Sequence, residues 1–90
     1  MTTTPVVEKK LSELRRGARG VIVKVGNDRT PVERVQQLLD LGILEGAEFE
    51  IAHEAPFGGD PIAVHIRGSV LALRRSEAAE VQVRVGGDQS

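Results

Sequence analysis

The chain has 90 residues, enough for one small domain, and a chain of this size buries only about 60–65% of its unfolded surface. Its 12 Lys and Arg against 13 Asp and Glu give a net charge of -1, so it lacks the basic excess of a dedicated nucleic-acid binder. Aromatic residues make up 2% and cysteine is absent, which excludes base-stacking platforms, disulfides and thiolate metal sites. The chain opens without a secretory pattern and carries no apolar run near the roughly 20 residues of a membrane span, so a cytoplasmic location is expected.

Small and polar residues predict flexible tails at 1–8 and 86–90, which leave residues 9–85 as the folded domain. The segment 11–17 indicates a short turn that ends at a glycine. The next segment, 21–25, is rich in β-branched residues and is bounded by glycines, which is typical of a strand.

A helix is predicted over residues 31–41. Thr30 is a favourable N-cap, and Glu33 three residues later completes the pattern of a capping box. Pro31 suits the first helical position, where a missing N–H costs nothing. Gly42 supplies the left-handed residue that commonly ends a helix.

The rest of the chain alternates apolar and polar residues and predicts four more strands, at 47–54, 61–67, 70–75 and 80–85. Ser76 is expected to cap a single helical turn between the last two. Five short strands, each with one solvent-facing side, predict a mostly β fold. The expected architecture is a small antiparallel barrel of about five strands, with one short helix between the first and second strands. Closure of the barrel is expected to remove the exposed sheet edges.

The hairpin formed by 47–54 and 61–67 allows a test of register. Setting Glu54 opposite Pro61 places apolar pairs on one face and acid–base pairs on the other, whereas a slip by one residue mixes the two kinds. The inward pairs are then His53–Ile62, Ile51–Val64 and Phe49–Ile66, and the outward pairs are Glu50–His65 and Glu48–Arg67.

The candidate metal ligands are His53, His65, Glu50 and Glu54. By alternation the two histidines point to opposite faces of the hairpin, so they are not expected to share one ion. His65 and Glu50 are either a cross-strand ion pair or a two-ligand metal site. His53 is either a histidine at the barrel rim or a ligand together with Glu54 or Asp60.

Candidate contacts for a protein partner lie in the loop 55–60 and in a basic group near the fourth predicted strand; they are Pro56, Phe57, Asp60, Arg67, Arg74 and Arg75. The two glycines of FGGDP do not make a phosphate loop, because the segment joins two strands and lacks the lysine of that motif. Because no serine or threonine stands in a strand–turn–helix elbow, the sequence does not predict an enzyme.

The segments LDLGILEG, GGDPIAVHIRG and LALRRSEA, in this order and spacing, resemble the FeoA family over residues 9–85. The resemblance implies an SH3-like barrel and an accessory, non-enzymatic role in bacterial ferrous iron uptake. It also implies a cytosolic partner, the GTP-binding part of a FeoB-type ferrous iron transporter, with no nucleic-acid ligand and no membrane contact except through the transporter.

An alternative stays open beside this interpretation. The same fold resembles the C-terminal domain of metal-dependent repressors, which suggests a carrier or sensor that binds a divalent transition metal, Fe²⁺ or Zn²⁺, weakly. No cofactor is otherwise expected. The sequence leaves open whether the protein forms a homo-oligomer.

Overall fold

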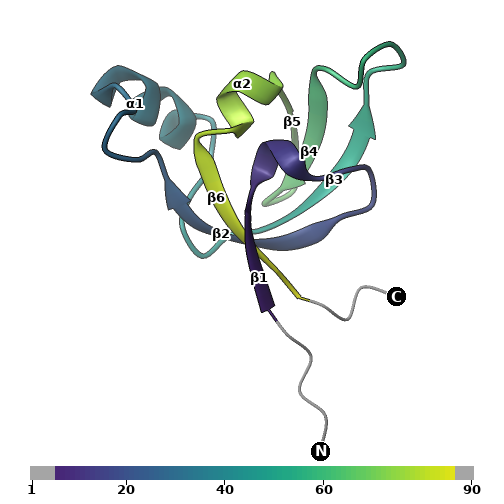
Figure 1. Cartoon of the computed structure of the whole chain (residues 1–90), viewed down its shortest axis with the longest axis horizontal. Helices are drawn as coiled ribbons and strands as arrows, with labels where there is room; N and C mark the ends of the chain where they lie inside the picture. The colour runs from purple at the N-terminus through teal and green to yellow at the C-terminus, as the bar shows by residue number, and fades with distance from the viewer. Residues whose placement is uncertain (1–5, 87–90) are drawn as a thin grey trace, which may run out of the picture.

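A six-stranded antiparallel sheet organises residues 6–86, the part of the chain that this computed structural model describes (Figure 1). The strands lie in the order β1-β6-β2-β3-β4-β5. The elements in chain order are β1 (Val6–Lys10), η1 (Leu11–Glu13), β2 (Arg19–Val25), α1 (Val32–Asp40), β3 (Glu48–Glu54), β4 (Ile62–Ile66), β5 (Ser69–Leu73), α2 (Arg75–Ala78) and β6 (Val81–Gly86).

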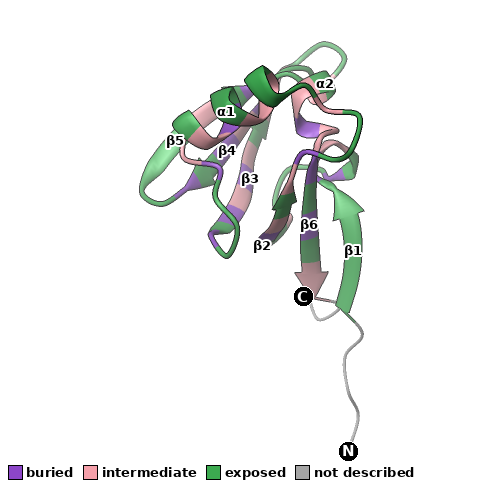
Figure 2. Ribbon diagram, turned by 90° about the vertical axis from the view of Figure 1, so that its left-hand side faces the viewer, coloured by how far each residue is buried: buried purple, intermediate pink, exposed green. Residues whose placement is uncertain are grey.

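Aliphatic side chains from every element except β1 fill the core inside the curled sheet (Figure 2). Among the described residues, no polar or charged side chain is buried. The most deeply buried large side chains are Leu11, Ile22, Leu38, Ile43, Ile51, Ile62, Val64, Leu73, Val81 and Val83. The expected mostly β, SH3-like architecture is therefore confirmed, with a helix after the first predicted strand.

The N-terminal part of the sheet was not anticipated. Residues 6–8, expected in a flexible tail, belong to β1, which pairs with β6 and brings the number of strands in the described part to six. The alternation test misses β1 because all five of its side chains are exposed. Gly86, also expected in a flexible tail, is the last residue of β6 and pairs with Val6 of β1. The remaining parts of the expected tails, 1–5 and 87–90, lie outside the described residues.

Closure of the barrel is also a correction. β1 and β5 stand at the two ends of the strand order and do not pair with each other, so the described sheet keeps two edges. Each edge strand has a single neighbour, β6 for β1 and β4 for β5.

The helix ends follow the sequence only in part. Gly42 has φ +100°, follows the C-cap residue Leu41 and ends α1 as expected. No side chain caps the first turn of α1, because Thr30 Oγ1 instead accepts a hydrogen bond from Asn27 N at 3.0 Å. At α2 the cap comes from Glu77, whose Oε1 accepts from the N–H of Arg74 at 2.9 Å, and not from the predicted serine.

Gly20 allows the close approach of three strands. A Cβ at this position would collide with the carbonyl oxygen of Arg84 on β6 and would lie 3.1 Å from the ring of Phe49 on β3. Only glycine leaves room for the backbone of β6 on one side and for the aromatic ring on the other.

Candidate functional site

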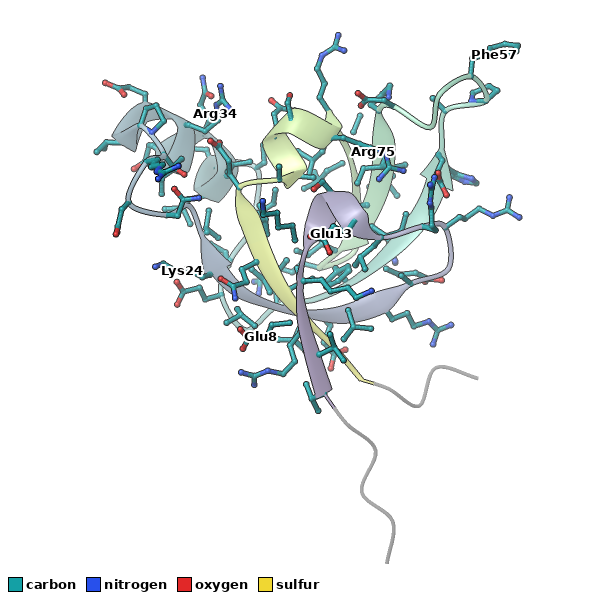
Figure 3. The ribbon with its side chains drawn as sticks, viewed as in Figure 1. Glu8, Glu13, Lys24, Arg34, Phe57 and Arg75 are labelled. Carbon is teal, nitrogen blue, oxygen red and sulfur yellow. The ribbon has the colours of Figure 1, made fainter. Side chains whose placement is uncertain are left out.

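The Arg75 side chain joins four parts of the chain, an arrangement called here the Arg75 clasp. Arg75 begins α2, and Nε donates to the carbonyl of Gly59 at 2.8 Å. Nη1 donates to the carbonyls of Ser12 at 2.7 Å and Leu14 at 3.2 Å, while Nη2 donates to Glu54 Oε1 at 3.0 Å. Figure 3 shows Arg75 between α2, η1 and the β3–β4 loop. One guanidinium therefore fixes that loop to η1, since its planar fork carries several donors at once.

A β-bulge in β3 brings Glu54 to the clasp. The expected register holds for Phe49, Glu50 and Ile51, which face Ile66, His65 and Val64. The register then shifts, and His53 faces Ala63 while Glu54 faces Ile62. Because a bulge adds one unpaired residue, every later side chain changes face. The expected pairs of His53 with Ile62 and of Glu54 with Pro61 are therefore wrong, and Glu54 turns to the inner side, where it meets Arg75.

The Glu54 carboxylate is held by donors on two sides. Oε2 accepts from the N–H of Arg16 at 2.9 Å, and Oε1 accepts from Arg15 Nη1 at 3.3 Å as well as from Arg75. The hydrogen bond from the Arg16 N–H is the largest cause that lowers the pKa of Glu54 below its ordinary value of 4.5. Burial opposes it, and the hydrogen bond from Arg15 and the charges of Arg15 and Arg75 lower the pKa further. Both carboxylate oxygens of Glu54 accept hydrogen bonds from nitrogen donors, so Glu54 is poorly suited to be a metal ligand.

The loop 55–61 is hydrogen-bonded to Arg75 near its C-terminal end and exposes an aromatic ring at its tip. Asp60 Oδ1 accepts from the N–H of Arg75 at 2.9 Å, and Gly59 N donates to the carbonyl of Ala55 at 3.2 Å. Gly59 has φ +67°, and a Cβ there would lie 2.9 Å from Glu54 Oε1. Glycine at this position therefore allows the loop to pass close to the clasp. Phe57 is 91% exposed and projects away from the fold (Figure 3).

The predicted basic group does not form. Arg67 lies in the turn before β5 and Arg74 directly after β5, so they stand at opposite ends of that strand. Arg75, beside Arg74 in the chain, is turned into the clasp with only 21% of its side chain exposed. Among residues 6–86, the ion pairs include neither Arg67 nor Arg74.

The histidines lie on the same outer face of the hairpin. Because His53 faces Ala63 and His65 follows Ala63 by two residues, the bulge cancels the expected separation to opposite faces. His65 faces Glu50, as expected, but Glu50 Oε2 is 3.7 Å from Arg19 Nε. The described residues contain no group of three or more histidine, cysteine or carboxylate side chains that could hold a metal ion. The four candidate ligands therefore do not fit a resident metal, which needs three or four donors from the protein.

Two surface grooves flank this hairpin. One, of about 670 Å³, is lined by residues that include the charged Arg19, Glu50 and Arg67 together with His65. The other, of about 400 Å³, lies on the mainly apolar surface beside the loop and includes Pro56, Pro61, Ala63 and Ala72. Neither lining contains a serine or threonine, so neither groove offers a hydroxyl nucleophile.

The clasp was missed in the sequence because three of its four acceptors are backbone carbonyls, which leave no residue-type signature. Its fourth, Glu54, is placed by a bulge that the alternating pattern does not show. Of the predicted contact residues, all are exposed except Arg75, and Asp60 and Arg75 take part in the hydrogen bonds that hold the loop.

In the described part of the chain, no helix combines the length and apolar character needed to cross a membrane. The model of the FeoA domain matches residues 9–85. The solution structure of the FeoA protein from Chlorobium tepidum is 39% identical, with a TM-score of 0.72, and the match covers 86% of this chain and 70% of that one.

The crystal structure of Stenotrophomonas maltophilia FeoA complexed with zinc, described as a prokaryotic SH3 domain protein, is 30% identical with a TM-score of 0.69, over 91% of this chain and 89% of that one. A manganese-dependent transcriptional repressor shares the fold alone, at 21% identity and a TM-score of 0.73, over 94% of this chain and 44% of the repressor. The barrel, the match over nearly all of its length and these likenesses place the chain in the FeoA family.

Proposed function

We propose that this protein is a non-enzymatic accessory factor of bacterial ferrous iron uptake that acts from the cytoplasmic side. In this proposal it docks on the cytosolic, GTP-binding domain of a FeoB-type ferrous iron transporter. Membership of the FeoA family supports the pathway. The observation that supports docking is the 91% exposed ring of Phe57 at the tip of a loop held by the Arg75 clasp.

An exposed aromatic ring on a fixed loop is suited to binding a protein. Aromatic anchors that enter a pocket of the partner commonly supply much of the binding energy of an interface. The clasp holds the loop through Arg75 and Asp60, so little conformational entropy remains to be lost on binding. Docking regulates the transporter only to the extent that this surface binds two states of the GTP-binding domain with different affinities.

The test is calorimetric titration of the full chain with the purified cytosolic domain of the ferrous iron transporter from the same organism, in its GDP-bound form and with a non-hydrolysable GTP analogue. We expect binding in at least one nucleotide state and a difference in affinity between the two. Phe57→Ala should weaken binding by about tenfold or more, as expected for an interface anchor.

Val32→Ala is the matched control, because Val32 is also an exposed apolar residue, at 79%, and lies on α1 at the other end of the molecule from Phe57 (Figures 1 and 3). The control should bind as the parent does. Absence of binding in every nucleotide state over a range of salt concentrations would overturn the proposal. An equal loss of affinity in Phe57→Ala and Val32→Ala would show that the loop 55–61 is not part of the docking surface.

A metal carrier or sensor is the second candidate. The zinc complex of the Stenotrophomonas maltophilia relative favours it. In this chain the four predicted ligands offer at most the neighbouring pair His65 and Glu50, so such a site would need donors from another molecule. The docking proposal is the better supported of the two.

A further inference from the structure

The outer edge of β5 carries backbone groups that the sheet leaves unused. β5 ends the strand order and pairs only with β4. Arg67 and Gly68 connect the two strands with φ of 52° and 81°, which is a two-residue type I′ turn. The hydrogen bond of that turn joins Ile66 to Ser69, and hydrogen-bonded pairs then alternate along the ladder. Val70 and Ala72 therefore point their N–H and C=O groups away from β4, toward the open edge.

The side chains along this edge are small and apolar on the outer face. Val70 is 62% exposed, and Ala72 is exposed beside it. Ala72 also lines the groove of about 400 Å³, together with Ala63, Pro56 and Pro61. A strand added next to β5 would place alternate side chains on this face, where the groove has room for an apolar group.

An exposed arginine stands at each end of the edge, and at the C-terminal end the carboxylates of Glu77 and Asp60 also lie close, because they accept from the N–H groups of Arg74 and Arg75. Arg67 precedes β5 and Arg74 follows it, both are exposed, and neither takes part in an ion pair within residues 6–86. An extended segment with acidic residues at its two ends complements this arrangement, since opposite charges across neighbouring strands are favourable. A second copy of the chain fits poorly, because antiparallel pairing of two β5 strands would bring Arg67 of one copy to the Arg74 end of the other.

We propose that the β5 edge binds an extended segment of a partner protein, apolar at its centre and acidic at both ends, which joins the sheet as a seventh strand. The inference rests on the proposed docking function and names the part of the partner that the surface recognises. Backbone hydrogen bonds to Val70 and Ala72 give the segment its register. Arg67 and Arg74 give it its charge preference.

The probe is a synthetic nine-residue peptide with a Val–Thr–Val–Thr–Val centre and two aspartates at each end, added to the ¹⁵N-labelled full chain and followed by NMR. We expect the amide signals of Val70 and Ala72 to shift and their hydrogen exchange to slow. A peptide with lysines in place of the aspartates should bind more weakly and lose less affinity in salt. No change at β5 with the acidic peptide overturns the proposal, as do equal affinities for the two peptides.

Two variants separate the backbone from the charges. Ala72→Pro removes one outward N–H, which an edge strand tolerates, and should weaken the peptide by about tenfold. Ala72→Thr keeps that N–H and is its matched control. Arg67→Asn with Arg74→Gln removes both charges, retains a residue suited to the turn, and should weaken the peptide by about fivefold at low salt. The NMR spectrum of each variant reports whether the fold is kept, and parental affinity in folded Ala72→Pro refutes strand addition.

The same variants separate this inference from the proposed function. If the transporter domain binds the parent and Ala72→Pro equally well, docking stands and the β5 edge is not its site. If the acidic peptide binds β5 but the transporter domain does not bind the protein at all, the edge is a binding site and the proposed partner is wrong.

Discussion

Replacing Arg75 by methionine should lower the free energy of unfolding by about 3 kcal/mol, which corresponds to the lower end of the range for two hydrogen bonds from a charged group. Methionine keeps the apolar stem but leaves the carbonyls of Gly59, Ser12 and Leu14 without their donor. The magnitude is that of two hydrogen bonds although three carbonyls lose their donor, because the Arg75 side chain is 21% exposed and water can replace part of the lost hydrogen bonding. The contact with Glu54 is left out of the sum.

The loss is large for a protein of this size, since a 90-residue domain is stable by only about 5–13 kcal/mol. At about 4–8 °C for each kcal/mol, the melting temperature should fall by about 12–24 °C. Circular dichroism during heating and during urea titration measures both quantities. Arg75→Lys should fall between the parent and Arg75→Met, because an ammonium group keeps the charge but cannot reach all the acceptors in their fixed positions.

Arg74→Met is the matched control, because the neighbouring arginine is exposed and takes part in no ion pair within the described residues. It should change stability by less than about 0.5 kcal/mol. A loss below about 1 kcal/mol in Arg75→Met, or equal losses in the two variants, would refute the reasoning that the clasp stabilises the fold, since the four bonds would then be worth less than one ordinary hydrogen bond.

Three further predictions concern other parts of the molecule. Folding lowers the pKa of Glu54, so its carboxylate stabilises the fold above pH 4.5, and this contribution is lost as the pH falls through the lower pKa of the folded state. In urea titrations over this pH range, the free energy of unfolding should fall less for Glu54→Gln than for the parent. The same dependence of stability on pH in both proteins would contradict the prediction. Gly20→Ala should cost about 1–3 kcal/mol in a urea titration because its methyl group meets the carbonyl of Arg84, and unchanged stability would show that the strands separate freely. Zinc calorimetry should show only weak binding, which His53→Ala combined with His65→Ala abolishes; a tight site in the parent that survives in the double variant would contradict the placement of the ligands.

The sequence predicted most of the sheet because its inner faces follow simple alternation. Val81 and Val83 are buried as expected, and so are Ile62, Val64 and Leu73 on β4 and β5. The hairpin register was correct from Phe49 to Ile51, where apolar and charged faces separate cleanly. In these segments the burial of one face decides the structure, and a local pattern is enough to show it.

The features missed depend on contacts between segments far apart in the chain. β1 has no apolar face of its own and is positioned by pairing with β6, more than 70 residues away. Among the candidate site residues, the exposure of Phe57 and of the two arginines at the ends of β5 agrees with the sequence, but the role of Arg75 does not. Its acceptors Ser12, in η1, and Leu14, directly after η1, lie more than 60 residues before it. No local periodicity reports such a distance, and no residue type marks a backbone carbonyl as an acceptor.

The bulge in β3 gives this strand two phases of alternation. Up to Ile51 the odd-numbered residues face inward, and from His53 onward the even-numbered one, Glu54, does. Regular pairing of all seven residues of β3, with Ala52 facing Ala63, would restore a single phase: the histidine would turn toward the interior, the glutamate toward solvent, and the guanidinium would lose its carboxylate without any change to either side chain. The bulge, as much as the composition of the strand, therefore determines whether the hairpin presents this carboxylate to Arg75.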